Sequence, residues 1–299
     1  MTKIRSRSST RVRDVRGSGG GGMSFPGLGG RGGGGLPIPM GAGGGILGLL
    51  VILAIVFLPR LLGGGQGAVS SPDANQSDSS GPTACESEIE QIVCGAVDDV
   101  ILYWDEQYPQ SFQGAFPATD TVFFSDVVNT GCGQAPAETG PFYCPLDQLV
   151  YFDLDFLQQL QSQFGASGDL AAQYIVAHEY GHHVQNVTGI SDRVRQLQEQ
   201  NPSVANDFSV ALELQADCFA GAWASSIEDN EFSNEGEIAE ALNAAEAVGD
   251  DRIMEQAGRE VDPDSFTHGS AEQRRQWFER GFTTADPEQC TTFNDALAP

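Results

Sequence analysis

Apolar positions recur every three or four residues along residues 169–187, which is the period of an α-helix with one buried face. Gly189 interrupts this pattern, and Ser167 is a candidate N-cap in front of it. Comparable helical patterns follow in three later segments: 204–227, 235–248 and 270–281. The second half of the chain is therefore predicted to be mainly helical.

A different pattern precedes these helices. Residues 120–128 and 149–153 are rich in β-branched and aromatic side chains, which favours strands. Between them, residues 129–133 and 138–141 contain the Gly, Asn and Pro residues that are typical of turns. We expect an α+β fold that is dominated by helices and has a small sheet near its start.

Closer to the N-terminus, residues 40–58 form a stretch of nineteen residues without a charge, which ends in a continuous apolar run. As a helix this stretch is roughly 28 Å long, about the thickness of a bilayer core. We expect residues 40–62 to be a transmembrane signal anchor. A cleaved signal peptide is disfavoured because residues 59–64 form a poor cleavage site. A buried core helix is disfavoured because the flanks are Gly-rich.

The charges divide at this apolar stretch. Residues 1–45 contain seven basic residues and one acidic residue, whereas seven basic and forty acidic residues follow Arg60. By the positive-inside rule, the N-terminus is predicted to be cytoplasmic and the acidic part to be extracytoplasmic. So large a negative charge would repel phosphate groups, which argues against a nucleic-acid-binding protein.

Composition also predicts the domain boundaries. Residues 1–39 combine Arg, Ser and Gly with almost no apolar periodicity, so we expect a disordered cytoplasmic tail. Residues 63–84 are of low complexity and are predicted to be a flexible linker. Residues 85–299 are numerous enough for one domain with a substantial core.

All six cysteines lie in the predicted extracytoplasmic domain, which indicates disulfide bonds. Six cysteines allow fifteen pairings. We expect Cys132 to pair with Cys144 across a Gly- and Pro-rich loop, and Cys218 to pair with Cys290, which ties the C-terminal tail to a helix. Cys85 and Cys94 then remain as the third pair.

The helix at 169–187 contains the pattern H-E-x-x-H at His178, Glu179 and His182. Two histidines four residues apart on a helix lie one turn above each other, so their imidazoles can bind a single zinc ion. Glu179 lies about 100° around the helix and can reach a water molecule at that site. The alternative is a pair of ordinary histidines on an amphipathic helix.

A catalytic zinc site needs a third protein ligand. Glu213 is the strongest candidate, because it shares one face of an otherwise apolar helix with Asp217. His183 points away from the two histidines and is expected to be a helix-surface or supporting group, while His268 could converge on the site from a distant segment. The alternative for Glu213 and Asp217 is a solvated acidic face.

Four separate stretches give the chain a family resemblance. They are 140–145 (GPFYCP), 178–185 (HEYGHHVQ), 213–221 (ELQADCFAG) and 268–270 (HGS). In these stretches the chain resembles the bacterial neutral zinc metallopeptidase family, which is gluzincin-like. The resemblance implies a zincin-like domain in which His178, His182 and Glu213 bind zinc and Asp217 orients a ligand histidine.

Together with the predicted anchor at residues 40–62, this resemblance implies a membrane-anchored, zinc-dependent hydrolase of peptide bonds, with a peptide or protein as its substrate. Glu179 would act as the general base, and His268 would be a second donor to the developing oxyanion. An extended peptide could pair with the strand edge at residues 122–128. Two alternatives remain: a catalytically inactive, zinc-containing binding module of the cell envelope, and an envelope structural protein without a metal.

Overall fold

The computed structural model describes residues 9–16, 84–156, 169–227 and 235–293. The predicted membrane anchor at 40–62 and the candidate N-cap Ser167 lie outside these residues. Within the described ranges, no helix combines the length and the apolar character that a membrane span requires.

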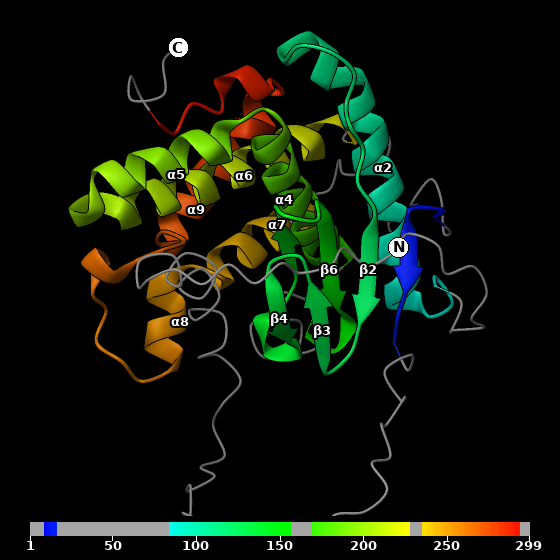
Figure 1. The fold of residues 1–299 in the computed structure, drawn as a ribbon, viewed down its shortest axis with the longest axis horizontal. Helices are drawn as coiled ribbons and strands as arrows, with labels where there is room; N and C mark the ends of the chain where they lie inside the picture. Colours follow the sequence, from blue (N-terminus) through cyan, green and yellow to red (C-terminus); the bar gives the residue numbers. More distant parts are fainter. Residues whose placement is uncertain (1–8, 17–83, 157–168, 228–234, 294–299) are drawn as a thin grey trace, which may run out of the picture.

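The main sheet has four strands in the spatial order β1-β2-β6-β5 (Figure 1). Strands β1, β2 and β6 run parallel, and β5 is antiparallel to β6. Strands β3 and β4 form a separate antiparallel hairpin. The strands span β1 Val12–Asp14, β2 Thr121–Phe124, β3 Val127–Thr130, β4 Gly133–Pro136, β5 Phe142–Cys144 and β6 Leu149–Asp153.

The predicted strand at 149–153 is confirmed as β6. The single strand predicted at 120–128 is instead two strands, β2 and β3, in two different sheets. Asp126 separates them with a left-handed φ of 64°, a conformation that ends a regular strand. Sequence alone did not predict β4 and β5, because each is only three or four residues long and lies among turn residues.

Helices make up the rest of the described fold. The four predicted helices are confirmed as α4 Asp169–Val187, α6 Ala205–Ser226, α7 Glu235–Ala247 and α9 Ala271–Thr284. Three further helices are α2 Glu88–Ser111, α5 Ile190–Gln200 and α8 Asp250–Gln256. Short 3-10 turns lie at Ala137–Thr139, Pro202–Val204, Pro263–Ser265 and Pro287–Gln289.

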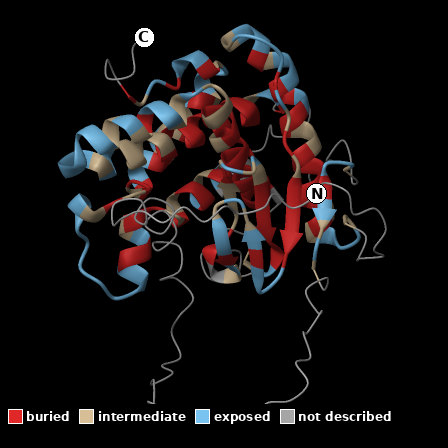
Figure 2. Ribbon diagram, viewed as in Figure 1, coloured by how far each residue is buried: buried red, intermediate tan, exposed pale blue. Residues whose placement is uncertain are grey.

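Helix α4 lies at the centre of the fold, between the sheet and α6 (Figure 1), and it also packs against α2 and α7. Nearly all of its residues from Leu170 to Gln185 are buried (Figure 2). A helix that is buried on every side has no solvated face for its polar groups, so those groups need internal partners. The Tyr180 hydroxyl, for example, lies 3.2 Å from the Thr121 hydroxyl of β2.

The expectation that residues 1–39 form a disordered tail is wrong for residues 9–16, where Val12–Asp14 form β1. Val12 is buried, and the Thr121 amide donates a 2.8 Å hydrogen bond to the Arg11 carbonyl. The Arg16 guanidinium reaches both Asp14 and Glu90. One buried apolar residue in a three-residue strand gives no periodic signal, which is why composition suggested disorder.

The three expected disulfides are confirmed. Cys85–Cys94 fixes the start of α2, and Cys132–Cys144 joins the turn between β3 and β4 to β5. Cys218–Cys290 joins α6 to the segment after α9, 72 residues further along the chain. The second and third disulfides therefore link separate elements of the fold.

Helices α6 and α9 approach each other closely at two glycines. A Cβ atom on Gly221 would lie 2.0 Å from the Phe278 carbonyl oxygen, and one on Gly281 would lie 1.9 Å from the Cys218 carbonyl oxygen. These separations are far below van der Waals contact, so only glycine allows the two backbones to pack at this distance.

We predict that Gly221→Ala destabilises the protein by about 1–3 kcal/mol or more, because the added methyl group forces α6 and α9 apart. Ser226→Ala, at an exposed position on the same helix, should change stability by less than about 0.5 kcal/mol. Urea unfolding of both variants measures the difference. Equal midpoints for the two variants would contradict the close packing.

Candidate metal centre

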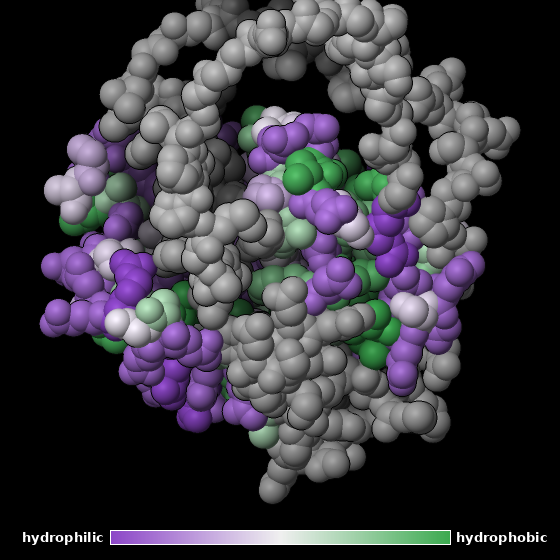
Figure 3. Space-filling view, turned by 90° about the horizontal axis from the view of Figure 1, so that it is seen from below, coloured by the Kyte–Doolittle hydropathy of each residue, from purple (hydrophilic) through white to green (hydrophobic). Residues whose placement is uncertain are grey.

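A cleft of about 390 Å³ opens between the strands and the helices. Its walls come from β4, β5, α4 and α6, together with the loop that contains His268. Figure 3 views the molecule from below: hydrophobic residues gather toward the middle of this face, and hydrophilic ones lie to either side. Apolar side chains in the wall include Ala135, Pro136, Phe142, Phe156, Ile175 and Leu212.

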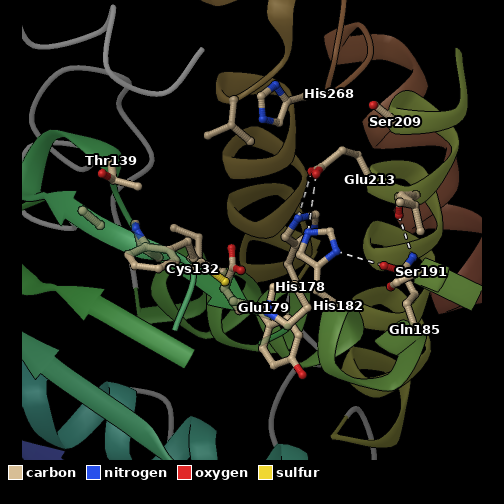
Figure 4. A pocket seen from close by; sticks show the side chains of 18 of the residues that line it. Cys132, Thr139, His178, Glu179, His182, Gln185, Ser191, Ser209, Glu213 and His268 are labelled. Carbon is tan, nitrogen blue, oxygen red and sulfur yellow. Dashed lines mark hydrogen bonds and ion pairs between the residues drawn. The ribbon is translucent and has the colours of Figure 1, made fainter. Parts of the chain in front are cut away.

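Three polar side chains converge in this cleft (Figure 4). His178 and His182 come from successive turns of α4, and Glu213 faces them from α6. The Nε2 atom of His178 lies 3.2 Å from one Glu213 oxygen, and Nε2 of His182 lies 3.5 Å from the other. The three residues each offer a ligand atom, and these atoms lie within 4.8 Å of one another.

This donor set fits zinc. Two imidazole nitrogens and one carboxylate oxygen are common ligands of catalytic zinc, and bond lengths of about 2.0–2.1 Å in a tetrahedral site imply ligand separations of about 3.3 Å. The two nitrogen-to-oxygen distances, 3.2 and 3.5 Å, bracket that value. The sequence thus predicted a group of residues that the fold brings together at metal-binding distances.

Each of these histidines has a partner on its other ring nitrogen. Nδ1 of His178 lies 2.8 Å from Oδ1 of Asp217, and Nδ1 of His182 lies 2.9 Å from Oε1 of Gln185. Both partner oxygens accept a hydrogen bond, so they favour the tautomer with the proton on Nδ1. The lone pair of each Nε2 is then free to bind a metal beside Glu213.

Asp217 is itself fully buried and has further partners. The Tyr174 hydroxyl donates a 2.5 Å hydrogen bond to Oδ1, and Arg274 of α9 binds both carboxylate oxygens through Nε and Nη2, at 2.8 and 2.9 Å. Burial opposes the charge of Asp217, but the charges of Arg274 and His178 lower its pKa to about 2. Asp217 therefore remains a carboxylate that accepts the hydrogen bond of His178.

The same charges set the other pKa values of the site. Burial opposes protonation of His178, yet the charge of Asp217 and the hydrogen bonds to Asp217 and Glu213 raise its pKa to about 9. Burial also opposes the charge of Glu213, but the neighbouring histidines lower its pKa well below the usual value. For Glu179 burial is the main cause, and it raises the pKa of this carboxyl group.

Glu179 lines the cleft next to the two histidines of α4 (Figure 4). Glu179 is 7% exposed, and burial is the main cause that raises the pKa of its carboxyl group. A buried carboxylate with a raised pKa is suited to accept a proton.

His268 lies at the edge of the same cleft, before the start of α9. Its Nδ1 lies 3.1 Å from Oδ1 of Asp250, while the other oxygen of Asp250 accepts the backbone N–H groups of Thr267, His268 and Gly269. Burial disfavours the charged imidazole, but the charges of Glu213 and Asp250 raise the pKa of His268. The structure thus places this histidine in the cleft, where the sequence suggested that it could converge.

His183 is not part of the metal-binding group. It is 1% exposed, its Nε2 donates to the Pro117 carbonyl at 2.6 Å, and its Nδ1 lies 3.0 Å from the Tyr143 hydroxyl. Both ring nitrogens are therefore engaged in fixing α4 to the strand side of the fold. We expected a surface or supporting residue, and the structure shows a buried supporting one.

Sequence reasoning assigned no role to Tyr174, Gln185, Asp250 or Arg274. Tyr174 and Gln185 lie on the motif helix, one turn from His178 and three residues from His182, so helical spacing could have suggested them. Asp250 and Arg274 reach the site from α8 and α9. No local pattern distinguishes these two residues from the other charged residues of an acidic domain.

Comparisons with known proteins agree with this geometry. The chain matches the family described as "Putative neutral zinc metallopeptidase" over residues 1–293. It is 40% identical to uncharacterized protein YpfJ of Escherichia coli K12 over 295 residues, which cover 97% of this chain and 98% of YpfJ. It is 48% identical to uncharacterized protein Rv2575 of Mycobacterium tuberculosis H37Rv over 184 residues, 58% of this chain and 61% of Rv2575. No solved structure matches the chain.

We predict that Glu213→Ala lowers zinc affinity by at least about 100-fold, because it removes one of three ligands. His183→Ala should retain zinc, because both ring nitrogens of His183 bond elsewhere. Dialysis followed by metal analysis of the two purified variants tests this. Loss of zinc from His183→Ala with retention in Glu213→Ala would show that the third ligand is misassigned.

We also predict opposite pH effects with and without metal. The folded pKa of His178, about 9, exceeds its ordinary value of 6.5. The stability that this protonated histidine contributes is complete below pH 6.5 and is lost as the pH rises through 9. Zinc must displace the same proton, so its affinity should rise by about tenfold per pH unit in that range.

Thermal unfolding from pH 6.5 to 9, with EDTA or with buffered zinc, measures both effects. The midpoint in EDTA should fall as the pH rises, while the extra stabilisation by zinc should grow. If the rise in the unfolding midpoint caused by zinc did not change with pH, no proton would leave His178 when the metal binds.

Proposed function

The chain belongs to the neutral zinc metallopeptidase family, and from this membership and the site geometry we propose that it is a zinc-dependent peptidase. The observation that carries the proposal is the convergence of His178, His182 and Glu213 at metal-binding distances, with Glu179 beside them in an open cleft. A purely structural zinc site has no need of a buried carboxylate next to the metal or of space for a substrate.

A zinc ion held by these three residues would polarise the scissile carbonyl and lower the pKa of a water molecule. Glu179 then accepts a proton from the attacking water and returns it to the leaving amine, so that it acts first as a base and then as an acid. Burial suits Glu179 to this role, because a raised pKa makes the carboxylate a stronger base. Asp217 and Gln185 keep the two ligand histidines in their metal-binding tautomer.

His268 is proposed as the second donor to the oxyanion that forms on the attacked carbonyl. It lies in the cleft wall, is held by Asp250 through Nδ1, and has its other ring nitrogen, Nε2, to offer. The raised pKa of His268 supports a protonated imidazole, which is the form that can donate to an oxyanion.

A peptide could reach this centre along the strands. We expected pairing at residues 122–128, but β2 is already paired with β1 and β6, so this expectation is wrong for residues 122–124. Strand β5 is the last strand of the sheet, and its residues Phe142 and Tyr143 line the cleft. We propose that an extended peptide lies along β5, with its apolar side chains in the cleft.

The alternative is a zinc-containing module that binds a partner without cleaving it. Glu179 separates the two proposals, because a binding module gains nothing from a base at the metal. Attachment to a membrane through residues 40–62 remains a prediction from the sequence.

We predict that Glu179→Gln lowers peptidase activity by about 100- to 10,000-fold while the protein still binds zinc, because only the general base is lost. Release of fluorescent peptides from quenched casein by the full chain in detergent measures activity, and metal analysis of the same samples measures zinc. If the wild type and Glu179→Gln both hold zinc and neither cleaves any substrate, the binding-module alternative replaces the peptidase.

His268→Ala should lower kcat by about 100- to 1,000-fold, with a smaller change in KM, because a donor that acts mainly on the transition state is lost. Its zinc content should match that of the wild type, since His268 is outside the ligand group. A variant with normal kcat would assign His268 to the loop structure alone.

A further inference from the structure

Arg274 is the only arginine or lysine among the described residues that line the cleft. It is 3% exposed and projects from α9 toward Glu213 and Asp217 of α6. Besides binding both oxygens of Asp217, it donates through Nη1 to the Val248 carbonyl at 3.2 Å and through Nη2 to the Tyr174 hydroxyl at 3.2 Å. Its guanidinium plane is therefore fixed from several sides.

A guanidinium that binds both oxygens of a carboxylate fixes the plane of that carboxylate, which a single point charge cannot do. Here the fixed carboxylate is the one whose Oδ1 lies 2.8 Å from Nδ1 of His178. Without Arg274, Asp217 would keep the Tyr174 hydroxyl and His178 as partners of Oδ1, but Oδ2 would lose its 2.8 Å hydrogen bond. The plane of this buried carboxylate, and with it the orientation of the His178 ring, would then be less firmly fixed.

We propose that Arg274 is a positioning residue of the metal centre: it holds Asp217 in the orientation that directs Nε2 of His178 toward His182 and Glu213. The proposal rests on the zinc site of the proposed function. Nη2 of Arg274 also approaches the ligands themselves, at 3.4 and 3.5 Å from the two ring nitrogens of His178 and 3.9 Å from a Glu213 oxygen. The shortest contacts of Arg274 are the 2.8 and 2.9 Å hydrogen bonds to Asp217, so the proposed route of its effect is through Asp217.

The test compares Arg274→Gln and Arg274→Lys in the full chain in detergent. Arg275→Gln is the matched control, because Arg275 is the next residue of α9, with a side chain that is 38% exposed and pairs with Glu246 and Glu279. Zinc affinity is measured by competition with a chelator. The visible spectrum of the Co²⁺-substituted protein reports the coordination geometry independently of activity.

We expect Arg274→Gln to bind zinc about 10- to 100-fold more weakly and to alter the Co²⁺ spectrum. Arg274→Lys should recover part of the affinity but not the spectrum, and Arg275→Gln should match the wild type. Wild-type affinity and an unchanged spectrum in Arg274→Gln overturn the proposal. If that variant does not fold, Arg274→Lys decides by the same two measurements. A wild type that binds no zinc would instead refute the proposed function.

A double-mutant cycle with Asp217→Asn tests the route of the effect. If Arg274 acts through Asp217, Arg274→Gln should change zinc affinity by much less in the Asp217→Asn background than in the wild type. Additive effects of the two substitutions would show that Arg274 acts by another route, and would overturn the proposal.

A second inference comes from the N-terminal arm, which we define as residues 9–16. The arm lies beside β2 and α2 (Figure 1), with backbone hydrogen bonds at both ends of β1. Ser9 donates a 2.5 Å hydrogen bond to Asp98 of α2, and the Arg16 guanidinium lies 5.6 Å from the centre of the Phe123 ring. The arm is thus an integral part of the domain.

The arginines of the arm make ion pairs with acidic residues that lie further along the chain. Arg11 and Arg13 pair with Asp120, and Arg16 pairs with the 7%-exposed side chain of Glu90. These arginines are among the basic residues that, by the positive-inside rule, predicted a cytoplasmic N-terminus. In the structure, three of these arginines form ion pairs with acidic residues of the domain.

Strands that share a hydrogen-bonded sheet cannot lie on opposite sides of a bilayer core about 30 Å thick. We infer that the arm and the domain lie in the same compartment. This inference replaces the single-pass arrangement with a cytoplasmic N-terminus, and it is independent of any metal.

Two measurements on the full chain in bacterial cells test this inference. Epitope tags at the N- and C-termini should show the same protection from protease in spheroplasts. In Ser9→Cys/Asp98→Cys, brief oxidation with diamide should link the two new cysteines, as detected by mass spectrometry of an unreduced digest. The native Cys132–Cys144 pair in the same digest is the oxidation control. Tags on opposite sides, or an intact control pair without the 9–98 link, would overturn the inference.

Discussion

The buried carboxylate of Asp217 is the constraint on which the rest of the site depends. A charge removed from water costs several kcal/mol unless the protein surrounds it with donors. Asp217 is fully buried, and its donors come from two other helices, Tyr174 and His178 on α4 and Arg274 on α9. The three helices must therefore approach closely, and Gly221 and Gly281 allow this between α6 and α9. The close packing of these helices and the pairing of the buried Asp217 charge therefore depend on each other.

The three histidines of the cleft share one arrangement. In each, Nδ1 faces an oxygen of a neighbouring side chain: Asp217 for His178, Gln185 for His182 and Asp250 for His268. The partners of His178 and His268 are carboxylates, whereas the partner of His182 is a neutral amide. The three rings therefore use the same nitrogen for this contact but differ in the charge of the group that they face. The kind of partner does not separate His178 and His182 from His268, whereas membership of the group around Glu213 does.

Much of the site was predictable because its signals are local. The H-E-x-x-H spacing needs only helical geometry, and Glu213 is conspicuous as an acid on an apolar helix. Arg274 and Asp250 were not predictable, because their roles come from contacts with residues far away in sequence. The fold divides in the same way: α4 and α6 have long periodic patterns, whereas β1, β4 and β5 are three or four residues long and depend on their neighbours.

The position of Arg274 on α9, after the metal-binding residues in the sequence, has a consequence for biosynthesis. Synthesis proceeds from the N-terminus at about 5–20 residues per second, and domains complete their folding when their last elements appear. His178 and Glu213 are made well before α9, and Cys290, which closes the longest disulfide, comes later still. A growing chain therefore contains the metal-binding residues before it contains Arg274, whose guanidinium binds Asp217. The arrangement of Asp217 and His178 seen in the structure is therefore complete only after α9 has been synthesised.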